Sequence, residues 1–262
     1  MIFFRISGFL DYLLFSRHRN GHGIHSPFIF DLISRVFRNK TANDIVLKIE
    51  EIRKRCLSSE RIIRVTDLGA GSLKMKGDLR KVSDIAAYSA VPKKYGVLLS
   101  ALAAEFGKPA VIELGTSLGI STMYIASGCP DSVVYTIEAC PETSAIAKEN
   151  FNAAGFKNIC FMNGSFDEAI PELKKQSVSP GLVFIDGDHR REPVLRYFDQ
   201  IVEISNSSTV IVLDDIHQSR EMEDAWNKVK LHKSVSATVD LYRIGLIFFR
   251  RGMSRSDYVI RY

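Results

Sequence analysis

Apolar residues are grouped in two ways along most of this chain. Short runs rich in valine and isoleucine alternate with longer segments in which apolar positions recur at helical spacing. The short runs predict strands over 110–114, 133–138, 159–163, 182–186 and 210–214. The longer segments predict helices over 92–106, 120–128, 144–154, 166–175, 193–205 and 221–232. Strands that alternate with helices in this way form a buried parallel sheet with helices on its faces.

The end of the chain adds two more strands to this pattern. Residues 236–240 and 245–250 are strand-like and lie a short connection apart, which predicts an antiparallel pair at one edge of the sheet. The sequence therefore predicts an α/β fold with a seven-stranded, mostly parallel sheet that ends in an antiparallel C-terminal hairpin. We assign this sheet to a domain over 89–262 and place an N-terminal helical extension over 1–88 before it.

The N-terminal extension is predicted to be helical. Pro27 suits the first turn of a helix, and Ser26 before it is a suitable N-cap. The predicted helices span 1–16, 27–38 and 42–57.

The composition is that of an ordinary folded protein with an uneven charge. Of its 262 residues, 46% are apolar and 25% are charged, which is enough to bury a large core. The net charge is +5, but residues 1–91 alone carry 16 Lys and Arg against 9 Asp and Glu. A basic N-terminal third is typical of a solvated surface or of a protein that meets an anionic partner, and we favour the solvated surface.

We expect a cytoplasmic protein. Residues 1–15 are apolar, but Arg5 and Asp11 interrupt them, and the segment is too short to span a bilayer and lacks the pattern of a signal peptide. One broad helical face there leaves weak contact with a membrane surface, or with a second copy of the chain, open. That face holds Phe3, Phe4, Phe9, Leu10, Leu13 and Leu14. Four cysteines show no metal or disulfide spacing and suit a reducing compartment, namely Cys56, Cys129, Cys140 and Cys160.

The most informative motif is a glycine turn after the strand over 110–114. Gly115 and Gly119 lie four residues apart, just before a helix that begins at Ile120. Glycine allows a sharp turn and a close ligand, and the free N–H groups of a helix start attract a negative group. A dinucleotide site would need a third glycine at Ser117. A similar turn over Asp67–Ser72 has a poor helix after it, so we expect only a loop that covers the site.

An acid ends the second strand, about 20 residues beyond the glycine turn. Glu138 stands where a carboxylate can accept hydrogen bonds from both hydroxyls of a ribose. The same carboxylate would repel a 2′-phosphate. A nucleoside-containing ligand without that phosphate is therefore expected at this edge of the sheet.

The turn, the spaced acid and the order of elements resemble the class I S-adenosylmethionine-dependent methyltransferases over residues 89–250. The resemblance is closest to the metal-dependent small-molecule O-methyltransferases, whose sheet also ends in an antiparallel hairpin. It implies a Rossmann-like fold, S-adenosylmethionine as cofactor and a small-molecule acceptor. Matched to this chain, the cofactor contacts are Glu113, Gly115 and Gly119 around the methionine, Thr116, Ser117 and Ser121 at its amino-acid end, Glu138 at the ribose, Gly164, Ser165, Phe166 and Asp167 at the adenine, and Asp186 beside the cofactor.

Two later strand ends carry acids that should meet at the same edge. Asp186 follows the fourth predicted strand, and Asp214 and Asp215 follow the fifth. Clustered carboxylates repel one another unless a cation or a proton lies between them, and oxygen ligands select Mg²⁺, Ca²⁺ or Mn²⁺. The resembling enzymes bind Mg²⁺ with acids at these positions, so we expect a Mg²⁺ site there. Helix capping or adenosine contact without a metal is the alternative.

The expected reaction is methylation of a hydroxyl on a small molecule or sugar, assisted by Mg²⁺. His189 lies three residues after Asp186, where some sugar-modifying relatives place a general base, so the expected catalytic residues are His189 and Asp186. The alternatives are RNA methylation and a non-catalytic protein that binds S-adenosylmethionine. The chain has no recognisable RNA-binding module, which makes nucleic acid the less expected partner. The sequence does not encode the identity of the acceptor.

Overall fold

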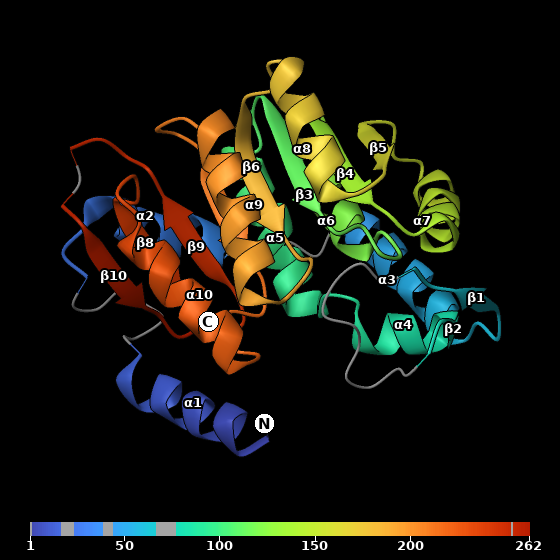
Figure 1. Ribbon diagram of the computed structural model, residues 1–262, viewed down its shortest axis with the longest axis horizontal. Helices are drawn as coiled ribbons and strands as arrows, with labels where there is room; N and C mark the ends of the chain where they lie inside the picture. Colours follow the sequence, from blue (N-terminus) through green and yellow to red (C-terminus); the bar gives the residue numbers. More distant parts are fainter. Residues whose placement is uncertain (1, 17–23, 39–43, 67–76, 253) are drawn as a thin grey trace.

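The computed structural model describes residues 2–16, 24–38, 44–66, 77–252 and 254–262 (Figure 1). These residues form an eight-stranded sheet, with helices on both of its faces, and a separate two-stranded hairpin. The predicted glycine turn over Asp67–Ser72 lies outside the described residues.

The large sheet has the strand order β10-β8-β9-β7-β6-β3-β4-β5. Counted along the chain, its parallel strands β3 to β7 stand in the order 3-2-1-4-5, which is the doubly wound order of Rossmann-like folds. Strand β9 runs antiparallel to both β7 and β8. The strands are β3 (Ala110–Leu114), β4 (Val133–Glu138), β5 (Ile159–Asn163), β6 (Pro180–Ile185), β7 (Val210–Leu213), β8 (Ala237–Asp240), β9 (Gly245–Phe248) and β10 (Ser256–Val259).

The predicted α/β fold and its antiparallel hairpin are confirmed, but the strand count was one too low. The additional strand, β10, pairs in parallel with β8 at the edge of the sheet. Its sequence is polar, and Tyr258 is its one buried residue, so it lacks the apolar run that predicts a strand. The separate hairpin of β1 (Ile62–Arg64) and β2 (Leu79–Lys81) was also not predicted.

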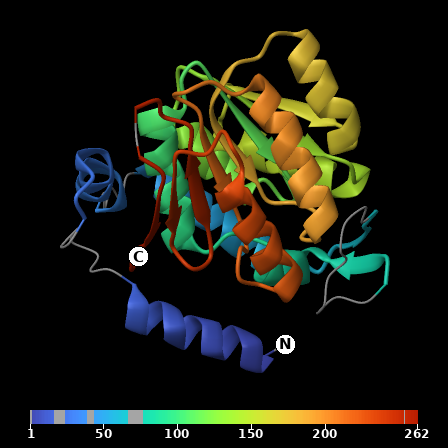
Figure 2. The same ribbon diagram turned by 60° about the vertical axis from the view of Figure 1, so that its left-hand side comes forward.

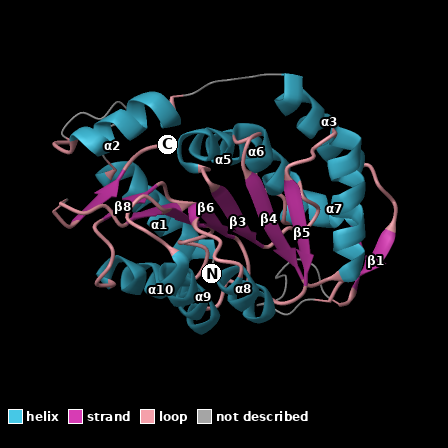
Figure 3. Cartoon of the chain, turned by 90° about the horizontal axis from the view of Figure 1, so that it is seen from above, coloured by secondary structure: helices cyan, strands magenta, loops and turns pink. Residues whose placement is uncertain are grey.

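Helices cover the two faces of the sheet in two groups (Figure 3). One apolar core joins the sheet to α2, α3, α5, α6 and α7, and the other joins it to α8, α9 and α10. The helices are α1 (Ile2–Phe15), α2 (Pro27–Leu32), the π-helix η1 (Ile33–Phe37), α3 (Asp44–Leu57), α4 (Val82–Tyr88), α5 (Lys93–Phe106), α6 (Ile120–Gly128), α7 (Pro141–Ala154), α8 (Phe166–Lys175), α9 (Arg191–Ile204) and α10 (Arg220–Leu231).

The carboxyl ends of the central strands are level with one another. Leu114 at the end of β3 lies beside Ile137 of β4 and Ile185 of β6, and Ile185 lies beside Leu213 of β7. Every residue of β3, β6 and β7 is buried, as expected for strands with helices on both faces. The residues that follow these strands therefore meet along one edge, where β3 separates the two halves of the doubly wound order. Ligands of such sheets bind at this point.

The N-terminal helices α2 and α3 share a core with the sheet. Ile29 and Ile49 are fully buried in the same apolar cluster as Leu98 and Phe248. The ring of Phe28 packs edge-on against that of Phe248, with centroids 5.1 Å apart. The predicted cap of α2 is confirmed, since the Ser26 hydroxyl accepts a hydrogen bond from the Ile29 amide.

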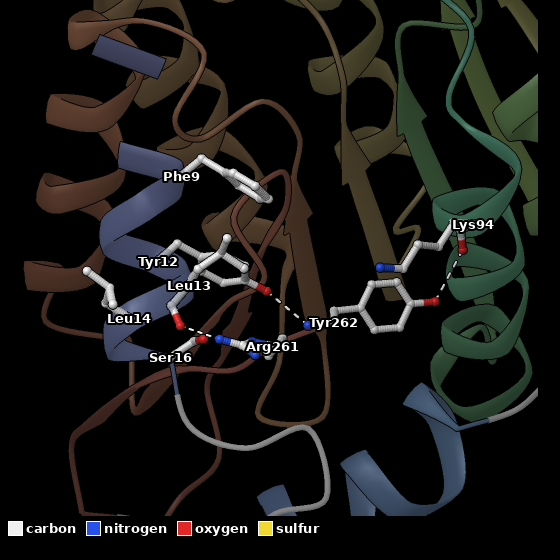
Figure 4. Close-up of a pocket in the computed structure, with 8 residues that line it drawn as sticks. All are labelled: Phe9, Tyr12, Leu13, Leu14, Ser16, Lys94, Arg261 and Tyr262. Atoms are coloured by element: carbon white, nitrogen blue, oxygen red, sulfur yellow. Dashed lines mark hydrogen bonds between the residues drawn. The ribbon is translucent and has the colours of Figure 1, made fainter. Parts of the chain in front are cut away.

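Helix α1 is joined to the rest of the protein through the C-terminus. It lies across the end of the molecule, near the C-terminus (Figure 2). The Tyr12 hydroxyl donates to the Ile260 carbonyl over 2.7 Å and accepts from the Tyr262 amide over 2.9 Å. Beside these bonds is a pocket of about 680 Å³ (Figure 4). It is lined by Phe9, Tyr12, Leu13, Leu14, Ser16, Lys94, Arg261 and Tyr262.

Part of the apolar surface of α1 is open to solvent. Leu14 and Phe15 are 75% and 77% exposed, and Ile6 and Leu10 are also exposed. Among the described residues, no helix combines the length and the apolar character that crossing a bilayer requires.

Replacing Tyr12 with phenylalanine should loosen α1 without disturbing the sheet. The change removes both hydrogen bonds and leaves the Ile260 carbonyl without this donor, which costs about 1–3 kcal/mol. Hydrogen–deuterium exchange measured by mass spectrometry should be faster in α1 and unchanged in β3 to β7. Tyr135→Phe on β4 is the matched control. Unchanged exchange of α1 in the Tyr12→Phe variant would show that these bonds do not hold the helix.

Candidate functional site

The glycine turn after β3 has a backbone that only glycine adopts without strain. Gly115 has φ +106°, and a Cβ there would lie 2.2 Å from the Asp186 carbonyl oxygen. Gly119 has φ +80°, and a Cβ there would lie 2.3 Å from the Phe151 ring. Gly119 is also the N-cap of α6 and contributes no side-chain hydrogen bond to it. The turn therefore lies against the end of β6 and presents the amide groups of a helix start.

A buried carboxyl supports the turn from beneath. Glu113 is fully buried, and its Oε2 accepts hydrogen bonds from the hydroxyls of Thr122 at 2.5 Å and Thr136 at 2.6 Å. The Thr136 hydroxyl also pairs with that of Thr116. Burial raises the pKa of Glu113 to about 7, although these hydroxyls lower it. Thr116 and Ser121, two of the predicted ligand contacts, are buried as well.

Glu138 at the end of β4 closes the other side of the turn. Its Oε2 accepts from the Ser117 amide over 2.8 Å, and its Oε1 accepts from the Cys140 amide over 2.9 Å. Burial raises its pKa, and these amides partly offset that shift. Each carboxylate oxygen has a second lone pair that can accept a hydroxyl. Glu138, the residue predicted to bind the ribose, thus lies directly beside the glycine turn.

The predicted adenine turn adjoins Glu138. The Gly164 amide donates to the Glu138 carbonyl over 3.1 Å. Ser165 forms a capping box with Glu168 at the start of α8, and Asp167 makes two hydrogen bonds to Arg196. These residues therefore have structural partners of their own. The ring of Phe166 packs edge-on against that of Tyr197, with centroids 5.2 Å apart, and a Cβ at Gly187 would lie 2.5 Å from the Phe166 ring.

The three predicted carboxylates converge at the ends of β6 and β7. The Asp186 amide donates to the Leu114 carbonyl over 2.9 Å, which fixes the residue across from Gly115. Burial, followed by the charges of Asp214 and Asp215, raises the pKa of Asp186 well above its ordinary value. Burial and Asp214 likewise raise the pKa of Asp215.

The guanidinium group of Arg243 lies among these carboxylates, at the place where a metal ion was expected. Arg243 donates through Nε to Asp214 Oδ1 over 3.0 Å and through Nη2 to Oδ2 over 2.7 Å. The same Nη2 lies 3.7 Å from Asp215 Oδ1. No group of three His, Cys, Asp or Glu side chains in the described part of the chain is arranged to hold a metal ion. The expected Mg²⁺ ligation by Asp186, Asp214 and Asp215 is therefore not supported, because the positively charged guanidinium of Arg243 lies directly against both oxygens of Asp214.

Two histidines lie near the cluster in different settings. His189 Nε2 is 3.5 Å from Asp186 Oδ1, so the expected catalytic pair is brought together. His217 Nε2 is 2.7 Å from Asp240 Oδ2, and its ring stacks on Tyr242. Burial lowers the pKa of His217, but the neighbouring carboxylates outweigh it, so the net shift is upward. Of the two, His189 is the one paired with a carboxylate of the cluster.

Comparison with known proteins identifies the central part of the chain. Residues 112–216 match a family model described as a methyltransferase domain. The O-methyltransferase of Bacillus cereus, solved with S-adenosylhomocysteine, superposes with a TM-score of 0.56 at 17% identity over 84% of this chain and 97% of that one. TomG, an O-methyltransferase of Streptomyces achromogenes solved with S-adenosylmethionine, gives 0.57 at 16% identity over 80% and 91%. These structures share the fold.

Residues 112–216 are thus similar to a methyltransferase domain. Among curated proteins, the catechol O-methyltransferase of Niastella koreensis is 28% identical over 137 residues, which are 51% of this chain and 61% of that one. The chain spans between 48% and 65% of the length of the first three curated relatives that it matches.

The site contains one residue that we did not predict, and it lies outside the matched residues 112–216. Arg243 lies in the short connection between β8 and β9, and β9 pairs with β7. The connection Leu241–Ile244 holds a single basic residue, and its predicted hairpin borders the strand that ends in Asp214. A basic residue in this connection was the sequence signal that could have predicted the contact with Asp214. Using that signal requires knowing that β9 lies beside β7.

The stability of the folded chain should depend on the ionisation of Glu113. Its folded pKa of about 7 exceeds its ordinary value of 4.5, so the folded state holds the proton more tightly. The stabilisation that the folded state gains from this proton is present in full below pH 4.5 and is lost as the pH rises through 7. It amounts to roughly 3 kcal/mol.

Glu113→Gln should therefore flatten the pH dependence of the free energy of unfolding, measured by urea denaturation at several pH values. Glu192→Gln at an exposed position is the control. If the Glu113→Gln variant and the wild type differ by the same amount at every pH, Glu113 does not titrate in this way.

Proposed function

We propose that the protein transfers the methyl group of S-adenosylmethionine to a hydroxyl of a small molecule or sugar. The observation that carries this proposal is the meeting of the glycine turn, Glu138 and Asp186 at one edge of the sheet. The contact between Gly115 and the Asp186 carbonyl joins the two halves of that edge. The two solved O-methyltransferases with S-adenosylmethionine or S-adenosylhomocysteine have the same fold, which supports the proposal.

The hydrogen-bonding groups at this edge suit S-adenosylmethionine. Glu138 would accept hydrogen bonds from the ribose hydroxyls, and the amide groups at the start of α6 would face the amino-acid carboxylate. Gly164 and Phe166 would border the adenine. Glu113 would act from below by holding Thr122 and Thr136, because its side chain is fully buried.

The reaction needs a base for the acceptor hydroxyl. When bound, S-adenosylmethionine supplies an electrophilic methyl group on a positively charged sulfur. His189 would take the proton from the acceptor hydroxyl, and Asp186 at 3.5 Å would orient the imidazole and stabilise its charged form. No step passes through a metal ion, because Arg243 occupies the carboxylate cluster.

Helix α1 would border the entrance for the acceptor. The Tyr242 hydroxyl donates to the Arg5 carbonyl over 2.6 Å, and the charge of Arg5 partly offsets the upward shift in the pKa of Asp215. The N-terminal extension therefore reaches the carboxylate cluster. The three carboxyl groups of the cluster disfavour the phosphate backbone of RNA, which supports a small acceptor.

Glu138→Gln should weaken binding of S-adenosylhomocysteine, measured by isothermal titration calorimetry. Losing the negative charge that receives the ribose hydroxyls should cost about 1.5–3 kcal/mol, a drop of roughly 10- to 100-fold in affinity. Glu172→Gln on the exposed face of α8 should bind as the wild type does. Equal affinity of the Glu138→Gln variant would overturn the assignment of the ribose site.

His189→Ala should reduce methyl transfer by about 100-fold or more while binding of S-adenosylhomocysteine stays unchanged. Transfer is measured with methyl-labelled S-adenosylmethionine against a panel of catechols, phenols and sugars. Replacing His232, which lies beside Phe198 and away from the cluster, is the control. A wild type that binds the cofactor but methylates nothing in the panel would favour the non-catalytic alternative.

A further inference from the structure

The side chain of Arg243 is held in a fixed position among the acids. Its own backbone carbonyl accepts from the Ile216 amide over 3.1 Å, which ties the β8–β9 connection to the segment after β7. The guanidinium carbon lies 5.8 Å from the centre of the Tyr95 ring. The side chain is 26% exposed, whereas that of Asp214 is completely buried. The Arg243 side chain therefore lies on the more exposed side of the carboxylate cluster, and backbone pairing next to β7 sets its position.

The contacts of Asp214 leave little room for a second cation. Both of its carboxylate oxygens accept from Arg243, at 3.0 and 2.7 Å, in the two-pronged geometry that guanidinium and carboxylate favour. A divalent metal would have to approach the same oxygens to about 2.0–2.6 Å. It would then stand where the guanidinium is, and like charges would be forced together.

The charges around Arg243 also keep it ionised. Burial alone would lower its pKa, but Asp214, Asp215 and Asp186 outweigh that effect and raise it. The cluster thus contains a permanent positive charge that needs no ion from solution.

We propose that Arg243 takes the place of the divalent cation of metal-dependent O-methyltransferases, so that this site works with a built-in guanidinium and binds no metal. Nη2 and Nε are used on Asp214, while Nη1 donates no hydrogen bond within the described residues. Nη1 is therefore the group that can donate to an acceptor oxygen. This last consequence for catalysis rests on the proposed methyl transfer, but the claim about metal binding does not.

The test compares Mn²⁺ binding to three forms of the full chain by electron paramagnetic resonance, with melting temperature as a second measurement. The wild type should bind no Mn²⁺ at the cluster and should melt at the same temperature with Mn²⁺ or with excess EDTA. Arg243→Met leaves Asp214 buried and unpaired, which should lower the melting temperature. Mn²⁺ should bind this variant at least about tenfold more tightly than the wild type and raise its melting temperature. In the double variant Asp214→Asn with Arg243→Met, the buried carboxylate of Asp214 is replaced by a neutral amide, and both effects of Mn²⁺ should disappear.

Two results would overturn the proposal. One is tight Mn²⁺ binding to the wild type that Asp214→Asn abolishes, and this arm does not depend on whether the Arg243→Met variant folds. The other is an Arg243→Met variant that folds and ignores Mn²⁺, since the carboxylates would then not form a cation site even when vacant.

Methyl transfer by the wild type gives a separate result. Activity that survives excess EDTA supports the built-in cation, and activity that requires added Mg²⁺ contradicts it. If no transfer is found while the Mn²⁺ results hold, the proposed function fails and the assignment of Arg243 stands.

Discussion

The level register of β4, β3, β6 and β7 is the constraint from which the site follows. Because Leu114 lies beside both Ile137 and Ile185, the turns after these strands meet along one line. Hydrogen bonds continue past the strand ends, as from the Asp186 amide to the Leu114 carbonyl. A slip of one residue in any strand would move these side chains to the opposite face of the sheet. The burial of every residue in β3 and β6 holds that register.

The same register concentrates negative charge, and that charge has to be balanced. Asp186, Asp214 and Asp215 lie together at the ends of β6 and β7, and burial strengthens their mutual repulsion. The guanidinium of Arg243 offsets this repulsion by its ion pair with Asp214. Arg243 lies in the connection just before β9, the antiparallel strand next to β7. The antiparallel hairpin of β8 and β9 therefore balances the charge of the cluster as well as extending the sheet.

Sequence patterns predicted most of this architecture because buried parallel strands give continuous apolar runs. The runs over 110–114 and 210–214 correspond to β3 and β7 within one residue. The polar strand β10 could not be recognised, because it adds a single buried residue to an existing edge. The convergence of the acids followed from strand ends alone. The ion pair between Arg243 and Asp214 could not be predicted in the same way, because it depends on which strand lies beside β7 and on how far one long side chain reaches.

The central claim is that one edge of the sheet binds the methyl donor beside a carboxylate cluster that Arg243 neutralises. A crystal structure of the full chain grown with S-adenosylhomocysteine and Mg²⁺ tests it most directly. We expect the ribose hydroxyls on Glu138, the sulfur atom on the side of Asp186 and His189, and the Arg243–Asp214 ion pair intact. A ligand bound elsewhere, or a Mg²⁺ ion coordinated by Asp214 with Arg243 displaced, would contradict the account.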